Sequence, residues 1–425
     1  MSYTIMNMKF RLIVMNFLIF AVWGAYLCSL GVYLGNINMG SNIGSFFAVQ
    51  GIVSLFMPAI VGIIADKWVP AQKMLGICHL LCAFFIAAAG YMGMTNPEPT
   101  FNQIFWLYSV SVAFFMPTIA LGNSVSYNAL TSAGYDTVKA FPPIRVWGTV
   151  GFIISMWIVD LTGAKESYMQ FFVSAAWGLI LGLYSFTLPN CPVQSGKTAS
   201  LVEALGLRAF ALFKQKKMAL FFVFSFLLGM CLQVTNGFAG TFLGDFGAID
   251  AFKDSFAVKH NIILSSLSQI SETLCILLIP YFLKRFGIKI VMLIAMLAWV
   301  LRFGFFGMGD PGSGVWLFVL SMIVYGVAFD FFNISGSLFV DQETDADIRS
   351  SAQGVFMMMT NGLGATVGSF CAQMVVDKEV YCYAATDSLR MAGWSNAWYM
   401  FSGFALVVAV AFAFLFKYKH NRVAA

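Results

Sequence analysis

The stretch LPNCPVQSGKTASLVEALGLRAFALFKQKKMA, Leu188 to Ala219, is one long polar segment in a chain of 425 residues that is otherwise built from apolar runs. It carries Pro, Ser and Gly early, an amphipathic stretch in its middle and a basic end. Six apolar runs precede it and six follow it. The stretch therefore predicts two six-helix halves, residues 1–188 and 217–425, joined by a linker at 189–216.

The amino-acid composition indicates that these apolar runs lie in a membrane. Hydrophobic residues make up 60% of the chain and charged residues only 10%, whereas a soluble domain is about 45–50% apolar and about 25% charged. A run of about 20 apolar residues is long enough to cross a bilayer as a helix. We therefore expect an all-α polytopic membrane protein with twelve transmembrane helices. The predicted spans cover roughly residues 10–35, 43–65, 73–94, 102–128, 142–160, 168–188, 217–243, 259–283, 288–308, 315–339, 351–376 and 395–416.

The basic residues predict the orientation. With both termini in the cytoplasm, only five of the 24 Lys and Arg residues fall in loops on the outer side: Lys165, Lys253, Lys259, Lys378 and Arg390. Cytoplasmic loops are the ones enriched in Lys and Arg, so both ends are expected inside. The net charge of +5 is then explained by membrane topology, and no nucleic acid partner is expected.

The two halves carry a weak internal repeat. FMPAIVGIIADKW (Phe56 to Trp68) and LIPYFLKRFGIK (Leu278 to Lys289) both run from a proline inside a span to a short charged cytoplasmic turn. Paired six-helix halves with a cytoplasmic linker are the organisation of major facilitator superfamily transporters. The loop GIIADKW also resembles the Gly-to-Asp-to-basic signature of that superfamily. We therefore expect the major facilitator superfamily fold.

Polar side chains recur at mid-span in the second half. Three pairs share the spacing i and i+3, which places both members on one helix face: Gln233 with Asn236, Gln269 with Glu272, and Asp330 with Asn333. Amides in spans commonly hold helices together. A charge at the helix centre costs about 2.5–3.5 kcal/mol on insertion scales and usually faces a cavity or a partner, so a functional role is favoured for Glu272 and Asp330.

The first half contributes FPPIRVWGTVGF, Phe141 to Phe152. Its two prolines suit the first turn of a helix, which puts Arg145, Thr149 and Phe152 on one face. Arg145 is alternatively an anchor whose charged end reaches the cytoplasmic boundary. Arg302 is either such an anchor or an internal counter-ion, and the sequence favours neither.

Several motifs taken together closely resemble the bacterial nucleoside:proton symporter family of the major facilitator superfamily. They are FPPIRVWGTVGF, LQVTNGFAGTFL (from Leu232), SQISETLCILLIPYFL (from Ser268), SMIVYGVAFDFFNISGSLFV (from Ser321) and AQGVFMMMTNGLG (from Ala352). The resemblance covers nearly the whole chain. It implies an inner-membrane transporter that takes up nucleosides with protons by alternating access, with both termini cytoplasmic.

The resemblance also implies a nucleoside site between the halves, near the membrane midplane. Its residues are Arg145, Thr149, Phe152, Gln233, Asn236, Gln269, Glu272, Phe329 and Asp330, with Glu272 and Asp330 as candidates for proton coupling. The chemistry agrees, because aromatic rings stack on a flat base and amides both donate to and accept from its edges. Two positions depart from the family pattern: Cys231 replaces an acidic residue and Tyr26 replaces a Trp, and both can alter base preference or coupling.

Other function classes fit less well. The three His residues (His79, His260 and His420) are scattered, and no Cys/His or Glu/His spacing suits a metal or a catalytic constellation. We therefore expect no enzyme activity, no catalytic residue, no metal, no cofactor and no obligate protein partner; the partners expected are nucleosides, protons and the lipid bilayer. A sugar:proton symporter is the alternative, because hydroxyl recognition uses the same residue types.

Overall fold

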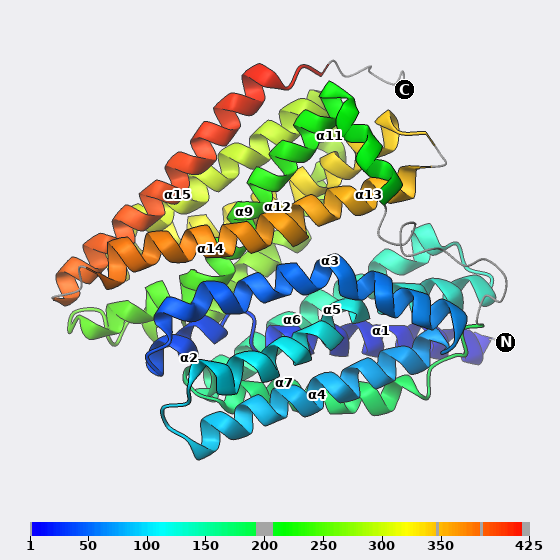
Figure 1. Ribbon diagram of the computed structural model, residues 1–425, viewed down its shortest axis with the longest axis horizontal. Helices are drawn as coiled ribbons and strands as arrows, with labels where there is room; N and C mark the ends of the chain where they lie inside the picture. Colours follow the sequence, from blue (N-terminus) through cyan, green and yellow to red (C-terminus); the bar gives the residue numbers. More distant parts are fainter. Residues whose placement is uncertain (1, 193–206, 346–347, 383–385, 419–425) are drawn as a thin grey trace. The chain divides into compact units, whose positions relative to one another are not determined.

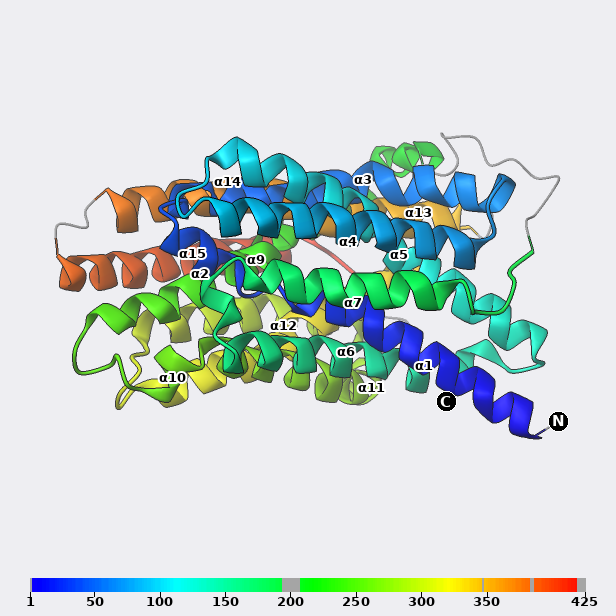
Figure 2. The ribbon, with the colours of Figure 1, turned by 90° about the horizontal axis from the view of Figure 1, so that it is seen from below.

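The computed structural model describes residues 2–192, 207–345, 348–382 and 386–418. Within these ranges the chain is helical, with short turns and no β-strand (Figures 1 and 2). A helix pairs its backbone N–H and C=O groups internally, which a lipid-embedded segment requires because hydrocarbon offers no hydrogen-bond partner. The prediction of an all-α fold is confirmed.

The chain divides into two compact units, Met1–Gly40 with Ile52–Leu205, and Ser41–Gly51 with Gly206–Ala425. The first contains α1 (Ser2–Gly24), α2 (Leu30–Asn36), most of α3 (Ile43–Lys67), α4 (Ala71–Thr95), α5 (Phe101–Ser132), α6 (Thr137–Leu161) and α7 (Met169–Ser185). The second contains the start of α3, then α9 (Lys216–Asp245), α10 (Phe256–Lys259), α11 (Asn261–Met308), α12 (Val315–Glu343), α13 (Arg349–Met357), the π-helix η5 (Met358–Gly364), α14 (Ala365–Val376) and α15 (Asp387–Leu415). Of the predicted linker, residues 193–206 lie outside the described residues, and Leu207–Lys214 forms a 3₁₀ helix.

Nine helices in the described part of the chain are long and apolar enough to cross a membrane. One of them, α11, consists of two helices that meet at a kink, and these correspond to the predicted spans 259–283 and 288–308. Gly287 lies between these spans with φ 77° and ψ 169°, a conformation that a residue with a Cβ rarely adopts. The glycine therefore ends one span and begins the next without an intervening loop. The chain is a multi-pass membrane protein.

Two local predictions were wrong. The first span, predicted as continuous from 10 to 35, ends as α1 at Gly24, and turns separate it from α2. The prolines Pro142 and Pro143 do not open a helix, because α6 already begins at Thr137. Their missing N–H groups therefore remove backbone hydrogen bonds inside α6.

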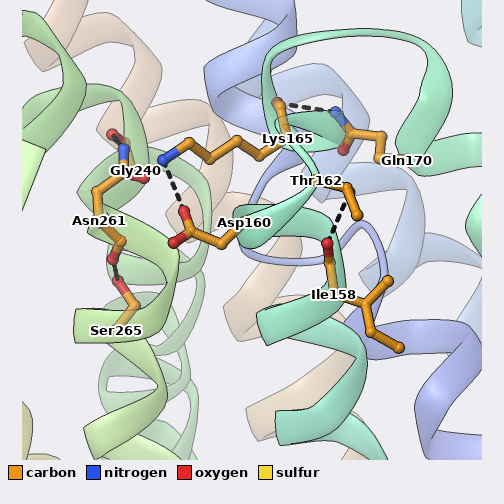
Figure 3. A network of polar contacts seen from close by, with 8 residues as sticks. All are labelled: Ile158, Asp160, Thr162, Lys165, Gln170, Gly240, Asn261 and Ser265. Atoms are coloured by element: carbon orange, nitrogen blue, oxygen red, sulfur yellow. Dashed lines mark hydrogen bonds and ion pairs between the residues drawn. The ribbon is translucent and has the colours of Figure 1, made fainter. Parts of the chain in front are cut away.

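Within the first unit, α4 packs against α5 and α7, and α1 packs against α6 and α7; α4 and α7 lie side by side in both ribbon views (Figures 1 and 2). A buried ion pair joins the end of α6 to the following turn. Figure 3 shows the Lys165 side chain extended to Asp160, with Nζ 2.6 Å from Oδ1. Both residues are buried, so the attraction of the pair offsets a large loss of hydration.

Within the second unit, α9 packs directly on η5 and α14. A Cβ built on Gly229 of α9 would come within 2.3 Å of the Thr360 carbonyl oxygen of η5. Small residues at such contacts let helix backbones approach closely in membrane proteins. The start of α9 meets the end of α12, because Lys217 Nζ lies 2.6 Å from Glu343 Oε1.

Candidate functional site

Asp330 of α12 is the most unusual polar group in the second unit. It is 5% exposed, and its Oδ2 is buried with no hydrogen-bond partner in the described part of the chain. Glu272 of α11 is half-buried, and the two carboxyl groups interact electrostatically. The α11 and α12 helices, which pack extensively together, thus bring the two predicted carboxylates into one neighbourhood.

The predicted amides lie on α9 and α11. Gln233 is buried and Asn236 is half-buried, and Asn236 Nδ2 donates a hydrogen bond of 3.1 Å to Gln233 Oε1. This bond fixes the orientation of both amides and leaves the remaining donors and acceptors of each for another group. Gln269 is half-buried one turn before Glu272.

Phe329, the predicted aromatic residue of α12, belongs to a group of stacked rings. The ring of Tyr325 is parallel to it, with centroids 5.7 Å apart. Trp299 of α11 meets Tyr325 edge-on at 6.0 Å. These contacts hold the half-buried Phe329 ring from behind, so that it offers a defined flat surface.

Arg302 is buried inside this unit, since it is 3% exposed. Its Nη1 donates to the Ser321 carbonyl oxygen at 2.7 Å and to Ser268 Oγ at 3.3 Å. Its guanidinium also lies 4.5 Å from the centroid of the Tyr325 ring. The guanidinium is therefore held by groups inside the unit.

A small, open pocket lies beside Phe329. It is lined by residues of α9, α11, α12 and η5, and its ring and polar groups are Trp299, Phe329, Phe332, Asn333, Thr360 and Asn361. Aromatic walls with a few polar groups are typical of small-molecule sites. Of the predicted site residues, only Phe329 lines this pocket.

The first unit holds the other predicted site residues on α6. The Arg145 guanidinium lies 3.8 Å from the centroid of the Phe20 ring of α1. Phe20 contacts Trp23 at 6.4 Å, and Trp23 meets Phe152 edge-on at 6.2 Å. Arg145 and Phe152 are therefore linked through two aromatic residues of α1, and the half-buried Thr149 lies one turn after Arg145.

Sequence reasoning missed several residues at these places. Trp23 has an indole Nε1 that is buried and makes no hydrogen bond among the described residues. Tyr325, Trp299 and Asn361 are apolar or amide residues in spans, and nothing in their local sequence separates them from packing residues. The available signal was motif membership, because Asn361 lies in AQGVFMMMTNGLG and Tyr325 in SMIVYGVAFDFFNISGSLFV, two of the motifs that carry the family resemblance.

Comparisons with known proteins agree with this resemblance. The model of the nucleoside H+ symporter family matches residues 6–421. Xanthosine permease of Escherichia coli strain K12 is 50% identical over 422 residues, 98% of this chain and 97% of the relative, and nucleoside permease NupG of the same strain is 48% identical over 423 residues, 98% of each. Sucrose permease of Escherichia coli is 22% identical over 302 residues, 68% of each chain.

The fold is similar to that of a solved relative. The crystal structure of the nucleoside transporter NupG superimposes with a TM-score of 0.87 at 47% identity, covering 97% of this chain and 100% of that one. The predicted major facilitator superfamily fold is confirmed, and the homologues are transporters. With the family model matching almost end to end, the chain belongs to the nucleoside H+ symporter family.

Proposed function

We propose that this chain is a proton-coupled nucleoside uptake transporter. The observation that carries the proposal is the buried Asp330 carboxyl group, whose Oδ2 has no hydrogen-bond partner in the described chain and which lies beside Phe329 and within electrostatic reach of Glu272. Ionisable groups inside spans mark substrate and proton pathways. Family membership and the names of the 48–50% identical permeases support nucleosides as the substrate.

The nucleoside binds between the two six-helix halves near the membrane midplane, and the halves alternate in access. Aromatic Phe152 and Phe329 stack on the base, and the amides Gln233, Asn236 and Gln269 pair with polar edges. Arg145 and Thr149 supply further donors from the first half. Each of these contacts follows from the hydrogen-bonding or stacking chemistry of the side chain named.

Protons are carried by Glu272 or Asp330. When both carboxyl groups are charged they repel each other, and the repulsion is strong where water is scarce. Binding one proton at either group relieves this repulsion, so proton binding is coupled to any movement that changes the distance between them or their access to water. The same carboxylates accept hydrogen bonds from ribose hydroxyls, so binding of the nucleoside and binding of the proton affect each other.

The protein resides in the bacterial inner membrane with both termini in the cytoplasm, and it works without a cofactor or an obligate protein partner. The distribution of Lys and Arg supports this orientation. It is a carrier and not an enzyme.

The test is uptake of labelled uridine and adenosine into cells that lack their own nucleoside carriers, with and without a proton uncoupler. The expected result is uptake that the uncoupler abolishes and that unlabelled nucleosides, but not sugars, inhibit. Uptake inhibited by free sugars would instead favour a sugar:proton symporter, the alternative to which the distant similarity with sucrose permease points. Absence of nucleoside uptake by protein that reaches the membrane would reject the proposal.

A further inference from the structure

The pocket beside Phe329 contains two side-chain amides that the predicted site does not use. Asn333 of α12 and Asn361 of η5 both line it, and both are half-buried. Among the described residues Asn333 has no side-chain hydrogen bond. Asn361 Nδ2 contacts only the Met357 sulfur, at 3.8 Å, and a thioether is a weak acceptor.

Thr360, the other hydroxyl or amide residue of the pocket, differs from these two. Its hydroxyl donates to carbonyl oxygens of its own helix, those of Phe356 at 3.1 Å and Met357 at 3.3 Å. Its donor is thus already used. The two asparagines therefore supply the free polar capacity of the pocket, because partly buried amides are normally paired with protein, water or ligand.

The backbone around Asn361 is unusual. Met358–Gly364 is π-helical, and π-helical turns are rare and are frequent at functional sites. The segment is pressed against α9, since a Cβ on Gly229 would come 2.3 Å from the Thr360 carbonyl oxygen. This close contact places η5, and with it Asn361, against α9 at the pocket wall.

On α12 the residues that line the pocket flank Asp330, and Asn333 lies one helical turn after it. Asn333 follows Asp330 by three residues on α12, about 4.5 Å along the axis. On α9 the pocket residues Leu228, Gly229 and Leu232 precede Gln233. The start of α9 meets the end of α12 at Lys217 and Glu343, so the two helices run in opposite directions. Asn333, which follows Asp330, and the pocket residues of α9, which precede Gln233, are therefore displaced toward the same end of the unit.

These features fit the two parts of a nucleoside. Its ribose needs acceptors for hydroxyl groups, which carboxylates supply, and its base needs a flat apolar surface and amides at its edge. Asparagine pairs with base edges through one donor and one acceptor. Phe329, next to Asp330 in the chain, and the two asparagines offer this combination in one pocket.

We propose that Asn333 and Asn361 recognise the edge of the nucleobase while its face lies against Phe329, so that this pair determines base preference. The inference rests on the proposed nucleoside transport. It adds Asn333 of α12 and Asn361 of η5 to the proposed base contacts, with the sugar at the level of Asp330.

The experiment measures KM for nucleosides that differ in one base substituent, using the full-length protein in cells. The pairs are adenosine and purine riboside, guanosine and inosine, and cytidine and uridine. The variants are Asn333→Ala and Asn361→Ala, with Asn102→Ala as the matched control, because Asn102 is exposed in the first turn of α5. The serine variants of both positions repeat the test if an alanine variant does not reach the membrane.

We expect the KM ratio of at least one pair to change about fivefold in one of the two variants, the loss of about one hydrogen bond, with the control unchanged. Ratios within twofold of the wild type for all three pairs, in both variants, would overturn the inference even if every KM rose equally. Failure of the wild type to transport any nucleoside is a separate outcome, which rejects the proposed function and the inference together.

Discussion

Tyr325 and Phe329, one turn apart on α12, lie with their rings parallel, their centroids 5.7 Å apart and their planes inclined by only 4°. The Arg302 guanidinium of α11 lies on Tyr325, 4.5 Å from its ring centroid. A buried charge on one helix thus supports, through Tyr325, the ring that we assign to base stacking. Arg302 acts in this arrangement as a positioning residue.

We expect Arg302→Met to raise KM for uridine about fivefold with less than a twofold change in the maximal rate. The substitution keeps an apolar stem but removes a cation–π contact worth about 1 kcal/mol and the bond to the Ser321 carbonyl oxygen. Arg302→Lys retains the charge, so its KM for uridine is expected to lie between those of the wild type and Arg302→Met. Initial-rate uptake over a range of uridine concentrations measures the effect.

The matched control for this variant is Arg285→Met, because Arg285 is exposed and its guanidinium lies over Phe286 instead. An unchanged KM in Arg302→Met, at a normal level of protein in the membrane, would show that the stack does not depend on the arginine.

Asp330→Asn is expected to abolish uncoupler-sensitive accumulation of uridine. If Asp330 carries the proton, the neutral and nearly isosteric amide still allows exchange of internal for external uridine, because exchange needs no net proton movement. If Asp330 holds only the ribose, exchange and accumulation are lost together. Counterflow from preloaded vesicles distinguishes the two roles.

Asp341→Asn is the control, since Asp341 lies on the same helix but is exposed and paired with Arg349 at 3.2 Å. Normal accumulation by Asp330→Asn would instead show that Asp330 neither carries the proton nor is needed to hold the ribose, and would leave Glu272 as the proton carrier.

Breaking the buried pair of Asp160 and Lys165 is expected to destabilise the protein by about 3–5 kcal/mol, because Asp160→Asn or Lys165→Met removes one charge of a buried ion pair. The double variant Asp160→Leu with Lys165→Met should recover part of the loss, since both charges are gone. Thermal unfolding of purified protein in detergent measures the effect.

Lys139→Met tests whether any lost ion pair has this effect, because the pair of Lys139 and Asp136 is long and exposed, at 3.9 Å. Equal losses at Lys139 and Lys165 would contradict the role of burial.

Gly229→Ala is expected to lower the amount of folded protein severely. The new methyl group would come 2.3 Å from the Thr360 carbonyl oxygen, and backbone atoms cannot move aside cheaply. Gly403→Ala in α15 is the control, because nothing lies within 4 Å of its Cβ, and a helical alanine is more stable than glycine by about 0.8–1.0 kcal/mol. The two substitutions should therefore have opposite signs in a thermal unfolding assay, and equal effects would argue against tight packing of α9 on η5.

The sequence predicted the helical spans well because the signal is local: twenty apolar residues in succession can be read without knowing their neighbours. Every predicted span falls on helix, and the error at the first span reflects a break that apolar composition does not reveal. The prolines of α6 were misplaced for a related reason. Proline favours a helix start only when nothing helical precedes it, and Thr137 to Ala140 already are helical.

The candidate site was predictable in part. Asp330 and Glu272 were found because a carboxylate in hydrocarbon is costly wherever it lies, so identity and depth alone mark it. Asn361 and Tyr325 were not, since an amide or an aromatic ring in a span is ordinary until its neighbours are known. Arg302 illustrates the limit: the sequence left a boundary anchor and an internal charge open, and only the structure shows that its guanidinium contacts Ser321 and Tyr325.

The sequence by itself determined that this chain is a helical membrane protein with charged groups at mid-span and the motifs of one transporter family, because hydrophobicity, charge and motif identity are properties of residues in order. Only the tertiary structure decided which rings stack, which amides share a pocket and which charge is buried against which partner. Those relations join residues far apart in the chain, such as Gly229 and Thr360, and they arise from packing between helices.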